Sequence, residues 1–166
     1  MSNGNSIPEH PEITRTATVA IFSPDMKRTL LIFNEHLMAI VPPGGKQDDK
    51  DKGSICRTGR REVREEVGID LETTSGIWLG IRGNRITDQK VVRRAFFTLN
   101  GKNFIDSLFF YQLIGNHQNL YDAEKRGEWY AKKTLQPETI LLDGRAYGVL
   151  VPGTREAVFN IMKGPI

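Results

Sequence analysis

The sequence has little that would suit a secreted or membrane-spanning protein. Cys56 is the single cysteine among 166 residues, so no disulfide can form within the chain, and a reducing compartment is expected. No stretch approaches the roughly 18 consecutive apolar residues that a transmembrane helix needs. Residues 1–11 are polar and lack the basic and apolar segments of a signal peptide. We therefore expect a cytoplasmic protein with no membrane partner.

The chain also lacks a large excess of charge, internal repeats and low-complexity segments. Its 23 Lys and Arg residues and 20 Asp and Glu residues give a net charge of +3, which is too small to indicate a nucleic-acid-binding protein. Hydrophobic residues make up 39% and charged residues 26% of the chain, as in soluble globular domains. This length suffices for one domain with a full core. We expect a flexible N-terminal tail over residues 1–12 and a single domain over residues 13–166.

Runs of β-branched and aromatic residues predict several strands. The run Thr16–Phe22 ends at a Ser-Pro-Asp turn, and Thr29–Asn34 is its expected hairpin partner. Asn100-Gly101 is a strong signal for a two-residue hairpin. The other strands are expected at Ala39–Val41, Ser75–Arg82, Val91–Leu99, Phe104–Ile114 and Glu128–Ala131. With helices between them, these strands predict an α+β fold.

Two helices are expected. Ser54 can cap a helix that runs to Val67, and Gly68 follows at the position that favours a left-handed residue. The face of this helix that is expected to meet the core carries Cys56, Gly59, Val63 and Val67. A glycine inside a helix is unfavourable, so we expect Gly59 to pack closely against a sheet. The second helix is expected at Thr154–Met162.

Three carboxylates share another face of the first helix: Glu62, Glu65 and Glu66. Like charges at this spacing repel one another by a few tenths of a kcal/mol. Such a face is either diluted by solvent or offered to a cation, and a solvated face is the commoner explanation for the pattern taken alone. Clusters of oxygen ligands suit Mg²⁺ or Mn²⁺. The segment that precedes the helix favours the cation.

That segment is Val41-Pro42-Pro43-Gly44-Gly45-Lys46, which ends an apolar run and opens the loop before the helix. Its glycine pair lets the backbone approach a ligand closely. Together the two segments resemble the Nudix hydrolase family, whose signature reads G-x5-E-x7-R-E-U-x-E-E-x-G-U, with U aliphatic. The residues that match are Pro43, Gly44 and Gly45 at the entry, and Arg61, Glu62, Val63, Glu65, Glu66, Gly68 and Ile69 in the second half.

The first half of the signature differs. Nine residues separate Asp51 from Arg61, whereas seven separate the family's first Glu from its Arg. We interpret residues 47–52 as a two-residue insertion in which Asp48, Asp49 or Asp51 stands in for that Glu. In the family this Glu often pairs with the Arg of the signature. We favour Asp51 as the partner of Arg61, in a bidentate pair, because Asp51 also lies near the helix N-terminus.

The resemblance implies a Nudix-type α/β/α sandwich with a mixed central sheet. It also implies a metal-dependent pyrophosphohydrolase, which cleaves a nucleoside diphosphate linked to another group. Glu62, Glu65 and Glu66 would bind Mg²⁺ or Mn²⁺ with the Gly44 carbonyl, and one of the three would also act as the base. Many members add an acidic residue shortly before a Trp-bearing strand, and Glu124 is the candidate here.

Substrate contacts are expected from Gly45 and Lys46, and from Arg82 and Arg94 in a basic cluster whose simpler interpretation is a solvated hairpin face. Arg61 would belong to the catalytic group, with Asp51 and Gly68 as structural residues. The expected substrate is a nucleoside triphosphate or a related nucleotide. The alternative is an inactive Nudix domain that binds nucleotides or other proteins. Homodimers are common in the family, and the sequence leaves this point open.

Overall fold

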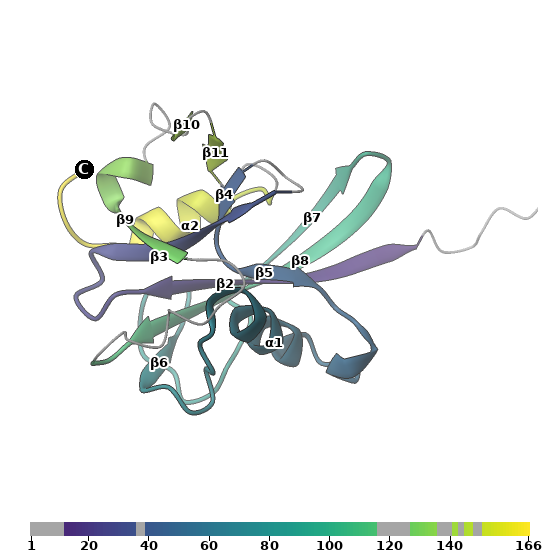
Figure 1. The fold of residues 1–166 in the computed structure, drawn as a ribbon, viewed down its shortest axis with the longest axis horizontal. Helices are drawn as coiled ribbons and strands as arrows, with labels where there is room; N and C mark the ends of the chain where they lie inside the picture. The colour runs from purple at the N-terminus through teal and green to yellow at the C-terminus, as the bar shows by residue number, and fades with distance from the viewer. Residues whose placement is uncertain (1–11, 36–38, 116–126, 136–140, 143–144, 148–150) are drawn as a thin grey trace, which may run out of the picture.

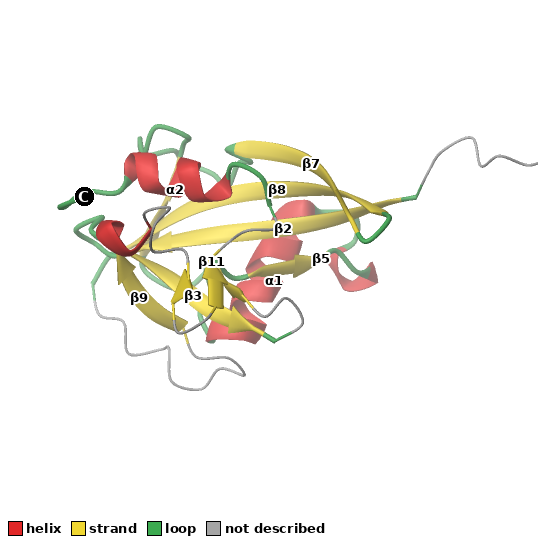
Figure 2. Ribbon diagram, turned by 90° about the horizontal axis from the view of Figure 1, so that it is seen from above, coloured by secondary structure: helices red, strands yellow, loops and turns green. Residues whose placement is uncertain are grey.

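The computed structural model describes residues 12–35, 39–115, 127–135, 141–142, 145–147 and 151–166. The strands in these ranges form one mixed sheet with a helix packed on each face (Figures 1 and 2). The strands are β2 (Ile13–Phe22), β3 (Arg28–Asn34), β4 (Ala39–Val41), β5 (Gly44–Lys46), β6 (Gly76–Leu79), β7 (Arg93–Leu99), β8 (Lys102–Leu113), β9 (Gly127–Ala131), β10 (Leu141–Leu142) and β11 (Arg145–Tyr147). The helices are α1 (Ile55–Val67) and α2 (Thr154–Ile161), and the 3-10 turns are η1 (Asp49–Asp51) and η3 (Lys132–Leu135). The expected α+β class with a mixed sheet is confirmed.

The sheet is built around two long strands that run parallel to each other. β2 and β8 pair along their length, from Ile13 opposite Asn103 to Phe22 opposite Gln112. The order across the sheet is β10-β11-β4-β3-β2-β8-β6, with β5 paired to β2, β7 to β8 and β9 to β3. β11 and β4 are also parallel, and the remaining pairs are antiparallel.

β2 is apolar on both faces because both faces are covered. Ala17, Val19 and Ile21 pack in the core beneath α1, whereas Ala20 and Phe22 pack in the core beneath α2. A strand buried on both faces reads as a continuous apolar run, which explains why this segment is easy to recognise in the sequence.

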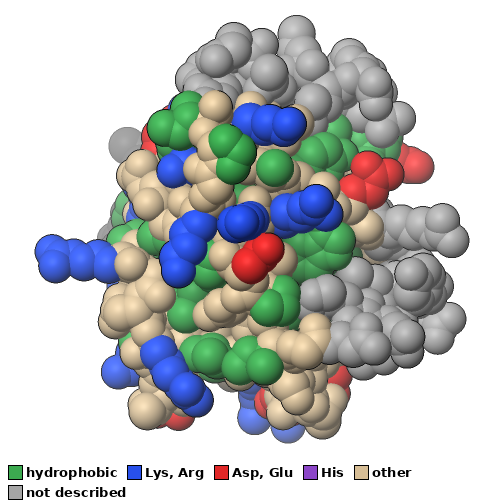
Figure 3. Space-filling model, turned by 90° about the vertical axis from the view of Figure 1, so that its left-hand side faces the viewer, with side chains coloured by type: hydrophobic (Ala, Val, Ile, Leu, Met, Phe, Trp, Pro, Cys, Tyr) green, Lys and Arg blue, Asp and Glu red, His purple; other side chains and the backbone are tan. Residues whose placement is uncertain are grey.

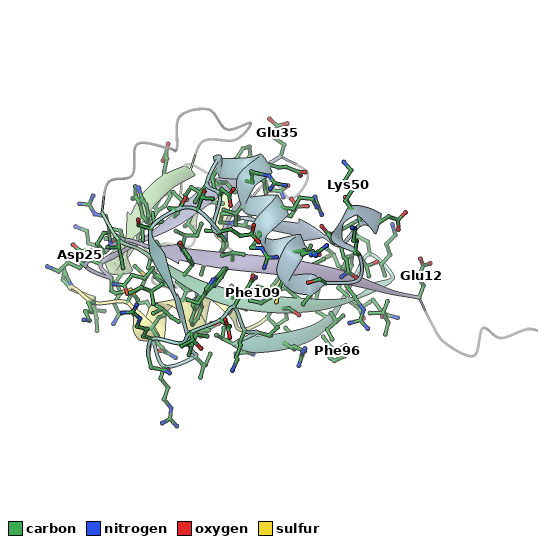
Figure 4. The ribbon with its side chains drawn as sticks, turned by 90° about the horizontal axis from the view of Figure 1, so that it is seen from below. Glu12, Asp25, Glu35, Lys50, Phe96 and Phe109 are labelled. Atoms are coloured by element: carbon green, nitrogen blue, oxygen red, sulfur yellow. The ribbon has the colours of Figure 1, made fainter. Side chains whose placement is uncertain are left out.

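α1 has the bounds that its end signals predict. The Ser54 side chain accepts a hydrogen bond from the Arg57 N–H, and Gly68 ends the helix with a φ of 73°. Val63 and Val67 are fully buried against the sheet. A Cβ at Gly59 would lie 3.0 Å from Val19 Cγ2, next to the ring of Phe109, which is labelled beside the helix in Figure 4. The expected close packing at Gly59 is confirmed.

The hairpin between β7 and β8 also follows the sequence. Asn100 and Gly101 have φ values of 51° and 76°, the conformation that the favoured two-residue turn requires. The rings of Phe97 and Phe104 stack across the hairpin with centroids 5.1 Å apart. Phe96 is 70% exposed and points outward from β7 (Figure 4).

β2 and β3 pair as the antiparallel hairpin that the sequence predicts, but over a short stretch, with Phe22 opposite Thr29. β5 pairs with β2 from Thr16 to Thr18 and takes that part of its edge. β3 also pairs with β4 and β9. The strand expected at 75–82 ends at Leu79, where the Gly80 N–H donates to the Asn84 carbonyl and closes a turn. Within the described ranges, no helix has the length and apolar character needed to cross a membrane.

Candidate active site

Arg61 is the centre of the site. It projects from α1, is 9% exposed, and meets the carboxylate of Asp51 through two hydrogen bonds. Nε donates to Oδ1 at 2.8 Å, and Nη2 donates to Oδ2 at 3.1 Å. The bidentate pair predicted between Asp51 and Arg61 is therefore confirmed. Asp51 is 1% exposed, so this pair fastens the loop before the helix to the helix itself.

Asp51 also accepts one hydrogen bond from the helix and one from the loop. Its Oδ2 accepts hydrogen bonds from Thr58 Oγ1 at 2.8 Å and from the Asp48 N–H at 3.0 Å. The hydrogen bond from Arg61, more than any other contact, lowers the pKa of Asp51 to about 2. Of the other two candidates, Asp48 is 3.6 Å from Arg61 and about half exposed, and Asp49 faces solvent. Lys50, at the centre of η1, points away from the helix (Figure 4).

The other contacts of Arg61 reach the glycine-rich strand and the acidic face. Nη2 donates to the Lys46 carbonyl at 2.8 Å. Nη1 donates to Glu62 Oε1 and to Glu65 Oε2, both at 3.1 Å. One guanidinium thus joins η1, β5 and two of the three glutamates. This arrangement relieves the repulsion expected among like charges on one helical face.

The two glycines of β5 lie against the chain on either side. The Gly44 N–H donates to Glu66 Oε1 at 2.9 Å, and Glu66 is 7% exposed. A Cβ at Gly45 would overlap the carboxylate of Glu62, and one at Gly44 would overlap the carbonyl of Ala17. At Gly44 the obstacle is backbone, so no larger residue fits there, whereas at Gly45 the Glu62 carboxylate would have to move.

The three glutamates supply oxygen ligands only, which is the donor set that Mg²⁺ and Mn²⁺ prefer. They do not yet converge: in the described part of the chain, no three acidic, His or Cys side chains surround a common point. Glu62 and Glu65 are turned toward Arg61, and a bound cation would have to draw them away from it. Burial, more than any other cause, raises the pKa of Glu62, and Arg61 opposes this effect. The residues fit a divalent ion in kind, with a rearrangement of these two side chains.

A cavity of about 560 Å³ opens on the other side of β5. Gly44, Gly45 and Lys46 line one part of it, so the predicted substrate-contact residues Gly45 and Lys46 lie at its wall. The remaining wall comes from the α2 side of the sheet, and includes Thr16, Thr18, Asp106, Phe97 and Phe104. β5 therefore has the acidic helix on one side and this cavity on the other.

Other predicted residues are not brought to the site. Arg82 and Arg94 are exposed and are not among the residues that line the cavity. Lys and Arg side chains also lie side by side across the face shown in Figure 3. The Lys132 ammonium group packs over the ring of Phe159 in α2. Lys132 does not line the cavity. Glu124 lies outside the described residues.

Sequence reasoning missed Asp106 and its neighbours on β2. Asp106 is 1% exposed and accepts hydrogen bonds on Oδ1 from Thr16 Oγ1 at 2.6 Å and Thr18 Oγ1 at 3.0 Å. Burial raises its pKa to about 6, against the effect of the two hydroxyls. A signal was present: Asp106 is an acidic residue within the apolar strand Phe104–Tyr111. Its two hydroxyl partners are about ninety positions away and depend on the register of β2 with β8.

No family model matches this chain, and no curated protein matches it. Solved structures of Nudix hydrolases do share its fold. A Nudix hydrolase from Clostridium perfringens is 14% identical, with a TM-score of 0.56 over 87% of this chain and 95% of the other. The dihydroneopterin triphosphate pyrophosphohydrolase of E. coli is 18% identical, with a TM-score of 0.58 over 89% and 94%. The Ap4A hydrolase of C. elegans is 17% identical, with a TM-score of 0.53 over 74% and 83%. The Nudix resemblance of the sequence is thus confirmed at the level of the fold.

Proposed function

We propose that this chain is a Nudix hydrolase, a metal-dependent pyrophosphohydrolase that cleaves a nucleoside diphosphate linked to another group, and that residues 13–166 form its catalytic domain. The observation that carries the proposal is the meeting of the two halves of the signature around β5. Arg61 and Glu66 on α1 bond directly to Lys46 and Gly44. The same strand borders a cavity of about 560 Å³, within the usual range for small-molecule sites.

The substrate we infer is a nucleoside triphosphate or a related nucleotide. Among the solved structures of the same fold, one is named as an Ap4A hydrolase and another as a pyrophosphohydrolase of a triphosphate. Lys46 is exposed and lines the cavity, so its ammonium group is available to an anionic chain of phosphates. The phosphates would then lie at β5 and the rest of the nucleotide in the cavity.

Glu62, Glu65 and Glu66 are the residues we propose as ligands of Mg²⁺ or Mn²⁺, with the Gly44 carbonyl. When bound, the ion supplies charge neutralisation for the pyrophosphate and a lower pKa for the attacking water. The chain's own residues provide the frame: Asp51 fixes Arg61, and Arg61 fixes the position of β5 beside α1. Burial raises the pKa of Glu62, and we assign to this carboxylate the proton that the attacking water releases.

The test is an assay of phosphate and pyrophosphate release from nucleoside triphosphates, dinucleoside polyphosphates and other nucleoside diphosphate derivatives, with Mg²⁺ or Mn²⁺. We expect at least one of these compounds to be hydrolysed. The matched control is Glu66→Gln, which keeps the size of the side chain and removes its charge. Absence of hydrolysis across the panel would contradict the proposal.

One observation favours a second function. Arg61 already engages Glu62 and Glu65, so the carboxylates are partly neutralised without metal, as suits a domain that binds nucleotides without cleaving them. The same panel separates the two functions. A binding domain would bind the nucleotides, as measured by calorimetry, and release no phosphate or pyrophosphate at any metal concentration.

A further inference from the structure

Asp106 lies in the wall of the cavity with half of its carboxylate unused. Oδ1 accepts the two threonine hydroxyls, whereas Oδ2 is buried and has no hydrogen-bond partner in the described part of the chain. No Lys or Arg of the described ranges forms an ion pair with it. Buried polar atoms are nearly always paired in native proteins, and an unpaired charged oxygen is among the costliest exceptions.

The surroundings of Asp106 show where a partner for Oδ2 would come from. Asp106 lines the same cavity as Gly44, Gly45 and Lys46. The stacked rings of Phe97 and Phe104 also belong to its wall, so the cavity offers flat apolar surface together with one carboxylate. Aromatic rings of this kind pack against other flat rings. The cavity therefore has a place for phosphates at β5 and a place for a planar ring beside Asp106.

We propose that Asp106 determines base specificity in this cavity: its free Oδ2 accepts an N–H of the exocyclic amino group of a nucleobase. The inference rests on the proposed function, which supplies the nucleotide. An ionised carboxylate can only accept hydrogen bonds, so it pairs with an amino group and repels a carbonyl at the same place. Oδ2 is shielded from solvent in this structure, so the side chains around it must shift before a ligand can reach it. A donor that projects from the rim of a ring, as an exocyclic amino group does, needs the smallest shift.

The two threonines determine how the Asp106 carboxylate is oriented. Thr16 and Thr18 are opposite Asp106 and Leu108 on the paired strand, and both hydroxyls donate to Oδ1. They hold the carboxylate in one orientation and leave Oδ2 as the oxygen without a hydrogen-bond partner in the described part of the chain. Without them, the carboxylate would turn and the two oxygens would be equivalent.

The experiment measures binding of nucleoside monophosphates by calorimetry, because these compounds have no pyrophosphate to cleave. Three pairs are compared, each differing by one amino group: GMP with IMP, AMP with purine riboside monophosphate, and CMP with its 4-deamino analogue. In at least one pair we expect the amino compound to bind about tenfold or more tightly, in line with a hydrogen bond to a charged group. Equal affinity, within about twofold, in all three pairs would overturn the proposal, and so would failure of every monophosphate to bind.

The variant Asp106→Asn places an amide at the same position, with its oxygen toward the two threonines and its NH₂ group toward the ligand. The preference for the amino compound should then disappear or reverse. Asp25→Asn makes the same chemical change at an exposed turn and should leave every ratio unchanged. Retention of the preference in Asp106→Asn would overturn the proposal.

The hydrolysis assay keeps the two proposals apart. If the wild-type protein cleaves triphosphates but shows no amino preference, the role of Asp106 is wrong and the proposed function stands. If it shows the preference, and loses it in Asp106→Asn, but cleaves nothing, Asp106 has its role in a binding domain and the pyrophosphohydrolase proposal is wrong.

Discussion

Arg61 shows how one residue can hold a site in place before any ligand binds. Its guanidinium donates to Asp51, Lys46, Glu62 and Glu65, and so uses nearly all of its hydrogen-bonding capacity. Planar, two-pronged contacts of this type depend on the shape of the guanidinium as well as on its charge. The position of β5 relative to α1 therefore depends on this side chain together with Glu66, which accepts the Gly44 N–H.

The first prediction concerns Asp51→Asn. The substitution keeps the size of the side chain but leaves Arg61 without its buried counter-charge, and breaking one side of a buried pair typically costs about 3 kcal/mol or more. Because Glu62 and Glu65 still contact Arg61, we expect a loss of about 2–3 kcal/mol in the free energy of unfolding and a moderate fall in kcat. Urea denaturation and steady-state kinetics measure the two effects.

The control for this prediction is Asp49→Asn, two positions away on the exposed side of the same turn. It should change neither stability nor kcat. If Asp51→Asn behaves like Asp49→Asn, the residues 47–52 are only an insertion, and Asp51 does not replace the Glu of the signature.

The second prediction concerns Glu66→Gln. The amide can still accept the Gly44 N–H through its oxygen, so β5 should stay in place and the stability should be nearly unchanged. The charge needed for a metal ligand is lost, and kcat should fall by about two orders of magnitude or more. A variant with near-normal kcat would exclude Glu66 from the metal site.

The third prediction is a pH dependence that comes from Asp106. Its pKa is about 6 in the folded protein, against the ordinary 3.8 of an Asp carboxyl group, so the folded state binds the proton more tightly than the unfolded state. Stability therefore falls as the pH rises from about 4 to about 6, by up to about 3 kcal/mol above that window. Comparing the wild-type protein with Asp106→Asn by urea denaturation from pH 4 to 8 isolates this slope, which should be absent in the variant. Identical slopes would show that the carboxylate is ionised throughout.

At the scale of elements, the sequence predicted the helix ends and turns that depend on residues close together in the chain. The bounds of α1 follow from Ser54 and Gly68, which act within one helical turn, and the β7–β8 hairpin follows from Asn100-Gly101. β5 was not predicted, because Gly44–Lys46 has no strand propensity of its own and pairs only because β2 presents the edge from Thr16 to Thr18. Glycines are unfavourable in strands, so only the tertiary contact explains this element.

The candidate site likewise has a part that the sequence predicted and a part that it did not. The acidic face of α1 was predicted because its residues lie within two helical turns of one another. The partner of Arg61 was predicted because the family resemblance implies that an acid of the loop pairs with this Arg, and because Asp51 lies near the helix N-terminus. The cavity was not predicted, because its wall joins β2, β5, β7 and β8, and no short segment contains that combination. Asp106 gave a local signal as an acid in an apolar strand, but its function depends on the distant threonines.

The fourth prediction belongs to the packing of β5 against α1. A Cβ at residue 45 would overlap the Glu62 carboxylate, the far end of a flexible side chain, so Gly45→Ala should destabilise the protein by about 1 kcal/mol, the low end of the cost of overpacking. Adding Glu62→Ala removes the obstacle, and the double variant should recover part of the loss. The double-mutant cycle in the free energy of unfolding measures this coupling. Strictly additive effects would mean that the two residues do not meet in solution.

At the scale of the whole molecule, β5 separates two kinds of chemistry. On one side are the glutamates of α1, and on the other is the cavity with Asp106. The two helices cover opposite faces of the sheet (Figure 2), so changes in the cavity need not disturb the acidic helix. This separation is what makes independent tests of cleavage and of base preference possible on one domain.

The last prediction uses metal binding to test the whole arrangement. A cation that binds only the folded protein raises its stability in proportion to the logarithm of its concentration, so Tm should rise with Mg²⁺ or Mn²⁺ and return to its starting value with EDTA. Hydrolysis should follow the same course, because the ion and the water it activates are lost together. NaCl at matched ionic strength controls for general screening of charge. In Glu66→Gln the rise in Tm should shrink, whereas in Asp106→Asn it should persist, because Asp106 lies on the opposite face of the sheet from the glutamates. Turnover that continues undiminished in EDTA would contradict the metal assignment, and a rise in Tm that depends on Asp106 would place the ion in the cavity instead.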